Sequence, residues 1–150
     1  MNRKFLIGAA SAGHQVEGNN TNSDTWAQEY METGGYKEKS LNAADHYHTY
    51  LEDIRKMAKA GLNAYRFSFE WARIEPEEGR FDEAEMNHYL DMVHACQESN
   101  IEPIVTLLHF TCPKWLITKG GWEADTTPDY FERYVRYVCN HLQGEELHYI

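Results

Sequence analysis

An α/β fold with a parallel sheet is predicted for this chain of 150 residues from four apolar stretches and the polar residues near their ends. The stretches lie at residues 5–9, 62–67, 104–108 and 146–150. Strands of a parallel sheet are buried on both faces and therefore read as continuous apolar runs. Gln15 follows the first stretch, Arg66 lies in the second, and His109 ends the third. We expect these side chains at the carboxyl ends of strands, where such folds keep their chemistry.

The segments between the strands carry the start and stop signals of three helices. The start signals are Asp45, Asp82 with Glu85 three residues later, and Thr127 followed by Pro128. Such residues begin helices, and Asp82 with Glu85 has the pattern of a capping box. Gly61 and Gly144 are expected to end the first and third helices, because glycine readily adopts the left-handed conformation that stops a helix.

The order of these elements narrows the fold class. Strands and helices alternate, which predicts right-handed crossovers. Long loops rich in Gly, Pro, Asn and aromatic residues follow the first three strands, at residues 18–26, 71–79 and 112–122. Such loops are typical of the active face of a (β/α)8 TIM barrel. About four strands and three main helices make the amino-terminal half of one, so residues 1–150 are predicted to be one partial domain truncated at the fourth strand.

Composition excludes several classes of partner. The formal net charge of -10, without a local cluster of Lys and Arg, disfavours nucleic acid and membrane surfaces. No glycine-rich phosphate-binding motif follows a predicted strand, so no nucleotide cofactor is expected. The two-residue spacing of His46 and His48 disfavours binding of one metal ion by both, so no metal is expected. Cys96, Cys112 and Cys139 suit a reducing compartment. The first apolar run is too short for a signal peptide, which predicts a cytoplasmic protein.

Five residues are candidates for a binding site. Arg66 lies inside an apolar strand and cannot lose its charge, so we expect it to face a carboxylate. That carboxylate is either the partner in a structural ion pair or a catalytic group that Arg66 keeps ionised. The amide of Gln15 offers a donor and an acceptor, which suit sugar hydroxyls. His109 is a candidate because it ends a strand beside aromatic residues that could stack on a sugar ring. Structural roles are the competing interpretation for both. Phe110 and Trp122 form a possible aromatic subsite for a sugar ring, with packing as the alternative.

Several runs of residues carry a family resemblance. They are residues 8–18, 44–48, 53–54, 61–68, Trp71, residues 73–74, Pro76, residues 101–103 and 105–107, His109 and residues 120–122. Together they resemble the amino-terminal part of glycoside hydrolase family 1, which includes β-glucosidases and 6-phospho-β-glucosidases. After His109 that family usually has Trp, Asp, Leu and Pro, and this chain departs from it with Phe110, Thr111, Cys112 and Pro113.

The resemblance implies a (β/α)8 barrel that hydrolyses β-glycosides with retention, using two glutamates. It implies that Gln15 and His109 hydrogen-bond the sugar and that Arg66 contacts the nucleophile. Both catalytic glutamates of the family would lie beyond Ile150. Glu70 has no catalytic role in the family pattern, so we predict it to be an ion-pair or loop residue.

Two hypotheses about function remain open at this point. The first is a glycoside hydrolase in which this chain carries the sugar-binding and supporting residues and is inactive alone. The second is a noncatalytic sugar-binding half-barrel, which could dimerise through its exposed sheet edges. In both, the expected small-molecule partner is a β-glucoside or a related small oligosaccharide.

Overall fold

The computed structural model describes residues 5–150 and contains a parallel sheet of three strands in the order β1-β2-β3. The strands are β1 (Gly8–Ala10), β2 (Ala64–Ser68) and β3 (Glu102–Thr106). The register places Ala10 beside Arg66, and Arg66 beside Ile104. Consecutive parallel strands joined by helices are the arrangement that the alternating sequence predicts. The α/β class and the parallel sheet are confirmed.

The predicted boundaries of the first and third strands are wrong by two or three residues. β1 begins at Gly8 rather than at Phe5, which is 81% exposed. Before Gly8 the ladder is incomplete: the Asn63 amide donates to the Ile7 carbonyl at 2.9 Å, but the Ile7 amide donates to the Asn63 side chain, to Oδ1 at 2.7 Å. β3 begins at Glu102 and ends at Thr106, so Leu107 and Leu108 lie beyond it and pack against the core as apolar loop residues.

The fourth apolar stretch does not form a strand among the described residues. Tyr149 makes a single parallel bridge to Ile104, and its carbonyl accepts a hydrogen bond of 3.3 Å from the Val105 amide. This bridge lies on the side of β3 opposite β2, which is where a fourth parallel strand would be placed. The prediction of about four strands is therefore wrong for residues 5–150, because one bridge does not make a ladder.

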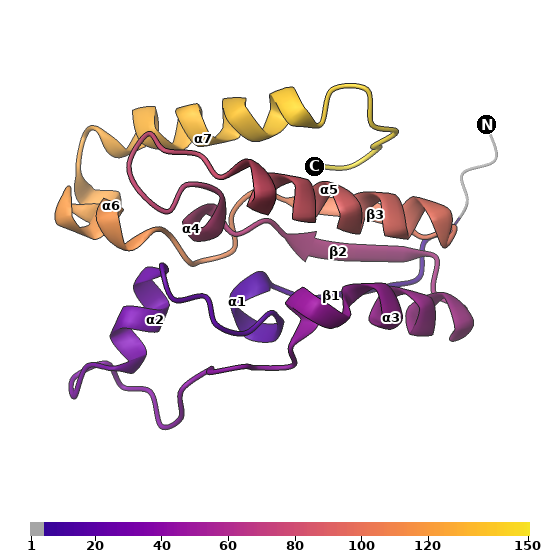
Figure 1. Cartoon of the computed structure of the whole chain (residues 1–150), viewed down its shortest axis with the longest axis horizontal. Coiled ribbons are helices and arrows are strands. Elements are labelled where there is room, and N and C mark those ends of the chain that lie inside the picture. The colour runs from indigo at the N-terminus through magenta and orange to yellow at the C-terminus, as the bar shows by residue number, and fades with distance from the viewer. Residues whose placement is uncertain (1–4) are drawn as a thin grey trace.

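Seven α-helices and one short 3-10 helix are present in the described residues. They are α1 (Gly13–Val16), α2 (Asp24–Glu29), α3 (His46–Lys59), α4 (Trp71–Ile74), α5 (Glu83–Glu98), α6 (Lys114–Thr118), η1 (Gly121–Glu123) and α7 (Thr127–His141). Figure 1 shows the short helices α2, α4 and α6 at the end toward which the β2 arrow points. The long helices α3, α5 and α7 match the three main helices that the sequence predicts. None of the helices described has the length and apolar character needed to cross a membrane.

The helix starts differ from the predicted caps in their hydrogen bonds. Asp82 caps α5 by accepting from the amides of Ala84 and Glu85, but the Glu85 carboxylate accepts from Tyr47 Oη at 3.0 Å and does not complete a capping box. Asp45 precedes α3 in the left-handed conformation and makes no side-chain cap. Its carboxylate is 2.7 Å from His48 Nδ1 instead.

The third main helix also begins differently from the prediction. α7 starts at Thr127, so the cap position falls on Thr126, whose side chain makes no cap. The Thr127 hydroxyl donates to the Gly121 carbonyl and joins the helix to η1. Gly61 and Gly144 both have positive φ after their helices, at 86° and 97°, as the sequence predicts.

The core lies between the sheet and the long helices. Each long helix turns apolar residues toward it, and fully buried members include Ile54, Phe67, Met86, Tyr89, Val93, Val105, Tyr134 and Val138. The three main helices that the sequence predicts thus supply much of the core. Burial of these large side chains fixes the strands, and with them the loops at the carboxyl ends of the sheet.

Candidate functional site

Two predicted site residues lie just after the carboxyl ends of strands, and the third lies in the middle of a strand. Gln15 is in α1, directly after β1; Arg66 is in β2; and His109 follows β3. Gln15 is exposed, whereas Arg66 and His109 are partly buried. The residues come from neighbouring strands of one parallel sheet, whose carboxyl ends share one edge.

Arg66 and His109 are joined directly by a hydrogen bond. Arg66 Nη2 lies 2.8 Å from His109 Nδ1, and Arg66 Nε donates to Thr106 Oγ1, also at 2.8 Å. A guanidinium can only donate, so His109 Nδ1 must be the unprotonated nitrogen. The neutral ring therefore carries its proton on Nε2. That leaves one N–H donor on the side of the ring away from Arg66.

The surroundings of His109 keep the ring uncharged. Partial burial, with the nearby positive charge of Arg66 as the second cause, lowers the pKa of His109 below its ordinary value. Both effects disfavour a second proton on the ring. At neutral pH His109 is therefore a hydrogen-bond donor of fixed tautomer and not a cation.

Arg66 makes no ion pair with a described residue. Its three contacts are Thr106, His109 and the Ser11 carbonyl at 3.4 Å, and the ion pairs of residues 5–150 involve other side chains. A guanidinium has five N–H donors, of which these contacts engage three. The expected carboxylate partner stays a prediction.

The two aromatic candidates lie in different surroundings. Phe110 is 83% exposed and has a positive φ of 65°, and its ring packs edge-on against His109 with centroids 4.8 Å apart. Trp122, in η1, packs against Trp71 and Phe131. Phe110 therefore lies beside the Arg66 and His109 pair, whereas the ring contacts of Trp122 among the described residues support helix packing.

Two glutamates lie buried behind this edge of the sheet. Glu17 accepts hydrogen bonds from Arg73 Nε at 2.8 Å and from Tyr89 Oη at 3.1 Å. Glu70 is 1% exposed and accepts from Asn20 Nδ2 and Thr111 Oγ1, each at 2.7 Å. The sequence predicts Glu70 to be an ion-pair or loop residue. It lies in the loop between β2 and α4, and both of these partners are neutral, so the loop alternative is confirmed and the ion pair is not formed with a described residue.

Burial controls the protonation of both glutamates. It raises the pKa of Glu70 to about 8, and the charge of Glu17 adds to the increase. It also raises the pKa of Glu17 to about 7 against the lowering effects of Arg73 and Tyr89. Since Arg73 contacts Glu17 directly, Glu70 is the carboxyl that more strongly favours the protonated form.

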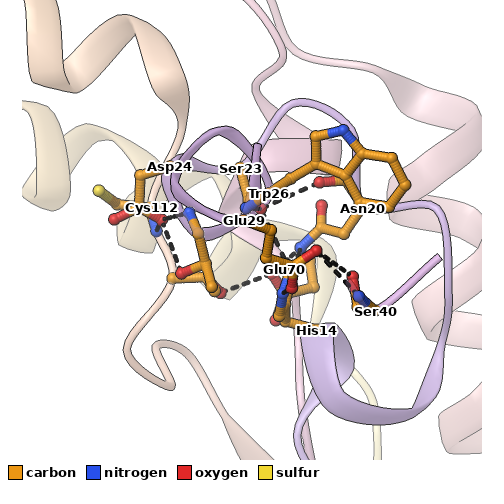
Figure 2. Close-up of polar contacts among 11 residues, drawn as sticks. His14, Asn20, Ser23, Asp24, Trp26, Glu29, Ser40, Glu70 and Cys112 are labelled. Atoms are coloured by element: carbon orange, nitrogen blue, oxygen red, sulfur yellow. Dashed lines mark hydrogen bonds and ion pairs between the residues drawn. The ribbon is translucent and has the colours of Figure 1, made fainter. Parts of the chain in front are cut away.

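Backbone bonds hold the first and third loops together. The Asp24 amide donates to the Cys112 carbonyl at 2.8 Å, and the Cys112 amide donates to Asp24 Oδ1 at 2.9 Å. Figure 2 shows these contacts beside the His14, Glu29 and Ser40 cluster. Glu29 accepts from the Ser40 amide and hydroxyl at 2.9 Å and lies 2.9 Å from His14 Nε2. The loops are thus interlocked by hydrogen bonds.

The histidines and cysteines show no shared ligand geometry. His46 pairs with Asp53 at 2.9 Å and His48 with Asp45 at 2.7 Å, so the two rings have separate partners. Within residues 5–150 no group of three or more acidic, histidine or cysteine residues is arranged to hold a metal. Burial raises the pKa of Cys96 and Cys112 to about 12, which keeps both as inert thiols.

A large groove lies at the opposite end of the sheet. It is an open groove of about 570 Å³ lined by Asn63, Glu102, His148, Tyr149 and neighbouring residues. Glu102 starts β3, so the groove is at the amino ends of the strands. In barrel folds this face serves stability, and the carboxyl end carries the chemistry. The size of the groove therefore does not make it the functional site.

Comparison with known proteins shows to which family the chain belongs. The model of glycosyl hydrolase family 1 matches residues 1–149. The chain belongs to this family. It is 37% identical over 153 aligned residues to a coniferin beta-glucosidase of Pinus contorta, an alignment that covers 97% of this chain and 30% of the pine protein. The chain thus spans about a third of the length of such relatives.

Solved structures of family 1 enzymes agree with the fold. A beta-glycosidase crystal structure superposes with a TM-score of 0.91 at 52% identity, covering 93% of this chain and 33% of the other. A Thermotoga maritima beta-glucosidase in complex with cyclophellitol gives a TM-score of 0.85 at 32% identity, covering 95% and 34%. Both are β-glycosidases, so the three-stranded sheet corresponds to part of a family 1 barrel.

Sequence reasoning singled out Glu70 but missed Asn20, Thr111 and the hydrogen bonds that join them to it. Asn20, Thr111 and Glu70 are hydrogen-bonded together, although they come from three different loops. Two signals point to them. Glu70 stands between Phe69 and Trp71, where a carboxyl is expected to be buried, and Thr111 stands at a position where the family usually has a carboxylate.

Proposed function

We propose that this chain provides the sugar-binding and supporting part of the active site of a β-glycosidase that retains anomeric configuration. The observation that carries the proposal is the hydrogen bond from Arg66, in the middle of β2, to His109, just after the carboxyl end of the adjacent strand β3. Family membership supplies the class of reaction, and the geometry supplies the roles of the side chains. The substrate class is a β-glucoside or a related small oligosaccharide.

Gln15 and His109 would bind hydroxyl groups of the sugar. His109 offers Nε2–H as a donor because Arg66 occupies the other ring nitrogen. The exposed amide of Gln15 offers both a donor and an acceptor, which matches the dual character of a hydroxyl. Phe110, next to His109, adds an apolar surface for the sugar ring.

Arg66 would support the nucleophile of the complete site. Two of its five N–H groups are not engaged by the described residues, which leaves a fork for a carboxylate. A cation in contact with a carboxylate lowers the carboxylate pKa and keeps it ionised. An ionised nucleophile is what retaining hydrolysis requires.

The catalytic glutamates themselves would come from outside residues 5–150. Retention needs two carboxyl groups about 5 to 5.5 Å apart that flank the anomeric carbon. Glu17 and Glu70 are buried and hydrogen-bonded within the protein, so neither can reach a bound glycoside. We therefore expect the 150-residue chain alone to bind sugar without cleaving it.

The first test is hydrolysis of an aryl β-glucoside by the purified 150-residue chain. No turnover above the rate of a buffer control is expected. Turnover that persists through purification and is lost in Glu70→Gln or Glu17→Gln would contradict the absence of a catalytic pair, and would place the chemistry on the buried carboxyls.

The second test is calorimetry with cellobiose, and with azafagomine, which is bound by a Thermotoga maritima relative. Weak saturable binding is expected, and Gln15→Ala and His109→Ala should each weaken it roughly tenfold, because each removes a hydrogen bond worth about 1 kcal/mol or more. Gln143→Ala is the matched control, since Gln143 is another exposed glutamine, after the end of α7. Equal affinities in all four proteins would contradict the proposed sugar contacts.

Two further properties belong to the proposal. We expect a cytoplasmic protein, which is supported by three cysteines without a disulfide. Self-association through the edges of β1 and β3 is also expected, because both edge strands present unpaired backbone groups. Cell fractionation and native mass measurement test these two properties separately from sugar binding.

A further inference from the structure

Glu70 is a buried carboxyl whose strong contacts all converge on one oxygen. Oε2 accepts from Asn20 Nδ2 and from Thr111 Oγ1, each at 2.7 Å. Oε1 has only Ser68 Oγ nearby, at 3.5 Å. Figure 2 shows the Asn20 amide and the Glu70 carboxyl pointing toward one another. No described cation contacts this side chain.

The partners of Glu70 connect it to both predicted sugar contacts. Thr111 lies two residues after His109, and Asn20 lies five residues after Gln15. Gly13, two residues before Gln15, packs on the same carboxyl so closely that a Cβ there would lie 2.5 Å from Glu70 Cγ. The Gly13 amide also donates to Ser68 Oγ at 2.8 Å. One side chain after β2 therefore touches the segments that carry Gln15 and His109.

We propose that Glu70 is a positioning residue, which sets the spacing between Gln15 and His109 by holding Asn20 and Thr111 on a single carboxyl oxygen. The proposal rests on the sugar-binding role of Gln15 and His109 given above. Two hydrogen bonds to one sugar ring are effective only when their donors and acceptors are held at a fixed separation. Glu70 provides that constraint from its buried position, through Asn20 and Thr111, without touching the ligand.

Burial, with the nearby charge of Glu17 as the second cause, raises the pKa of Glu70 to about 8 and favours the carboxylic acid, against the lowering effect of its hydrogen bonds from Thr111 and Asn20. Oε2 receives both hydrogen bonds as the carbonyl-type oxygen, which leaves Oε1 to carry the proton. The charged groups that influence Glu70 are Glu17, which favours the protonated form, and Arg73, which opposes it. A glutamine has the same shape, and its carbonyl oxygen can accept the same two bonds. Glu70→Gln is therefore expected to preserve the positioning.

A second connection between the loops must be separated from this one. Residues 22–24 and 112–114 are joined by backbone bonds, such as the Lys114 amide to the Asn22 carbonyl at 2.8 Å. Those bonds do not use Glu70. A test must therefore delete single side-chain contacts of Glu70 and follow the effect across the sheet.

The experiment follows the Gln15 side-chain amide and the His109 ring by NMR in the folded 150-residue chain. Thr111→Val removes one hydroxyl near His109 and is expected to shift the signals of Gln15, on the far side of Glu70. Asn20→Ala is expected to shift the His109 ring in return. Thr118→Val is the matched control, because its hydroxyl makes only a local bond to the Trp115 carbonyl. It should leave both reporters unchanged.

The Glu70 variants show whether the carboxyl transmits these effects. In Glu70→Gln both reporters should keep their wild-type signals, and Thr111→Val should still shift Gln15. In Glu70→Ala the shift of Gln15 caused by Thr111→Val should vanish. Thr111→Val and Glu70→Gln keep the test decisive if Glu70→Ala does not fold. Effects of Thr111→Val confined to His109 and its neighbours, with Gln15 unchanged, would overturn the proposal.

Sugar affinity gives a separate readout. Thr111→Val is expected to weaken cellobiose binding several-fold. The single variant Glu70→Gln is expected to bind cellobiose with the wild-type affinity. Coupling between the reporters in a chain that binds no sugar would contradict the proposed function and leave the positioning role of Glu70 intact. Sugar binding with no coupling would overturn the positioning role alone.

Discussion

The two ends of the sheet hold their polar residues in contrasting ways. At the carboxyl end, Glu70 and Glu17 are buried, and their hydrogen bonds join segments from three loops. At the amino end, Glu102 pairs with His148, which is 62% exposed, beside an open groove. Buried polar groups need hydrogen-bond partners, so their contacts fix the positions of the loops that supply those partners. Exposed ion pairs are weak and constrain the chain little. The contrast indicates that the carboxyl end is the organised, functional end.

The largest expected effect comes from Gly13→Ala at the carboxyl end. A Cβ there would lie 2.5 Å from Glu70 Cγ and 2.9 Å from Glu17 Oε1, and both side chains are buried. We expect a loss of about 3 kcal/mol in the free energy of unfolding, measured with urea. Gly144→Ala, near the amino end, has open space around it and only its positive φ of 97° to strain, so it should lose about 1 kcal/mol. Equal losses of unfolding free energy in Gly13→Ala and Gly144→Ala would contradict the difference between the two ends of the sheet.

The next effect separates a fully buried carboxyl from a partly buried one that pairs with an exposed histidine. Glu70→Ala leaves the Asn20 and Thr111 donors without an acceptor, and we expect a loss of about 2 kcal/mol in unfolding free energy. Glu102→Ala removes the surface pair with His148 and should change stability by less than about 0.5 kcal/mol. A Glu70→Ala protein as stable as Glu102→Ala would show that the buried cluster does not hold the loops.

The pH dependence of stability follows from the raised pKa values of Glu17 and Glu70. Both acids have an ordinary pKa of 4.5 and native values of about 7 and about 8. Between these limits the native state binds more protons than the unfolded state, so stability falls as pH rises, by at most about 1.4 kcal/mol per pH unit for one proton.

The window from pH 6.5 to pH 8 isolates this effect. His88, whose pKa burial lowers from 6.5 to about 4, costs stability only below that window. Chemical denaturation across the window should show falling stability in the wild type and a flatter profile in Glu70→Gln. Identical slopes in the two proteins would mean that Glu70 does not hold a proton in the native state.

The smallest expected effect concerns the His109 ring. Arg66→Met removes the donor to Nδ1 and the nearby charge, so the His109 pKa should rise toward its ordinary value, while partial burial, the larger cause of the lowered pKa, remains. Imidazole nitrogen NMR would also report loss of the fixed tautomer. Arg55→Met removes an equal charge from an exposed position on α3 and should change neither property. The same tautomer in Arg66→Met would refute the role of Arg66.

The sequence predicts what depends on periodic burial. Apolar runs and helix stripes locate β2, α3, α5 and α7, and resemblance to family motifs identifies the family. Contacts between loops are not periodic, so the bonds from Asn20 and Thr111 to Glu70 could not be derived from spacing. The fourth strand was predicted from an apolar run at residues 146–150, yet Tyr149 forms only a single bridge, because a strand needs a ladder of partners as well as an apolar run.

The most direct test of the account is to locate the bound sugar. Cellobiose titrated into the isotopically labelled 150-residue chain should shift the NMR signals of Gln15, Arg66 and His109, in the site toward the carboxyl ends of the strands. The groove at the amino end, read through Asn63, Glu102 and His148, should remain unchanged despite its size. Shifts confined to the amino-end groove would contradict the assignment of the functional end of this sheet.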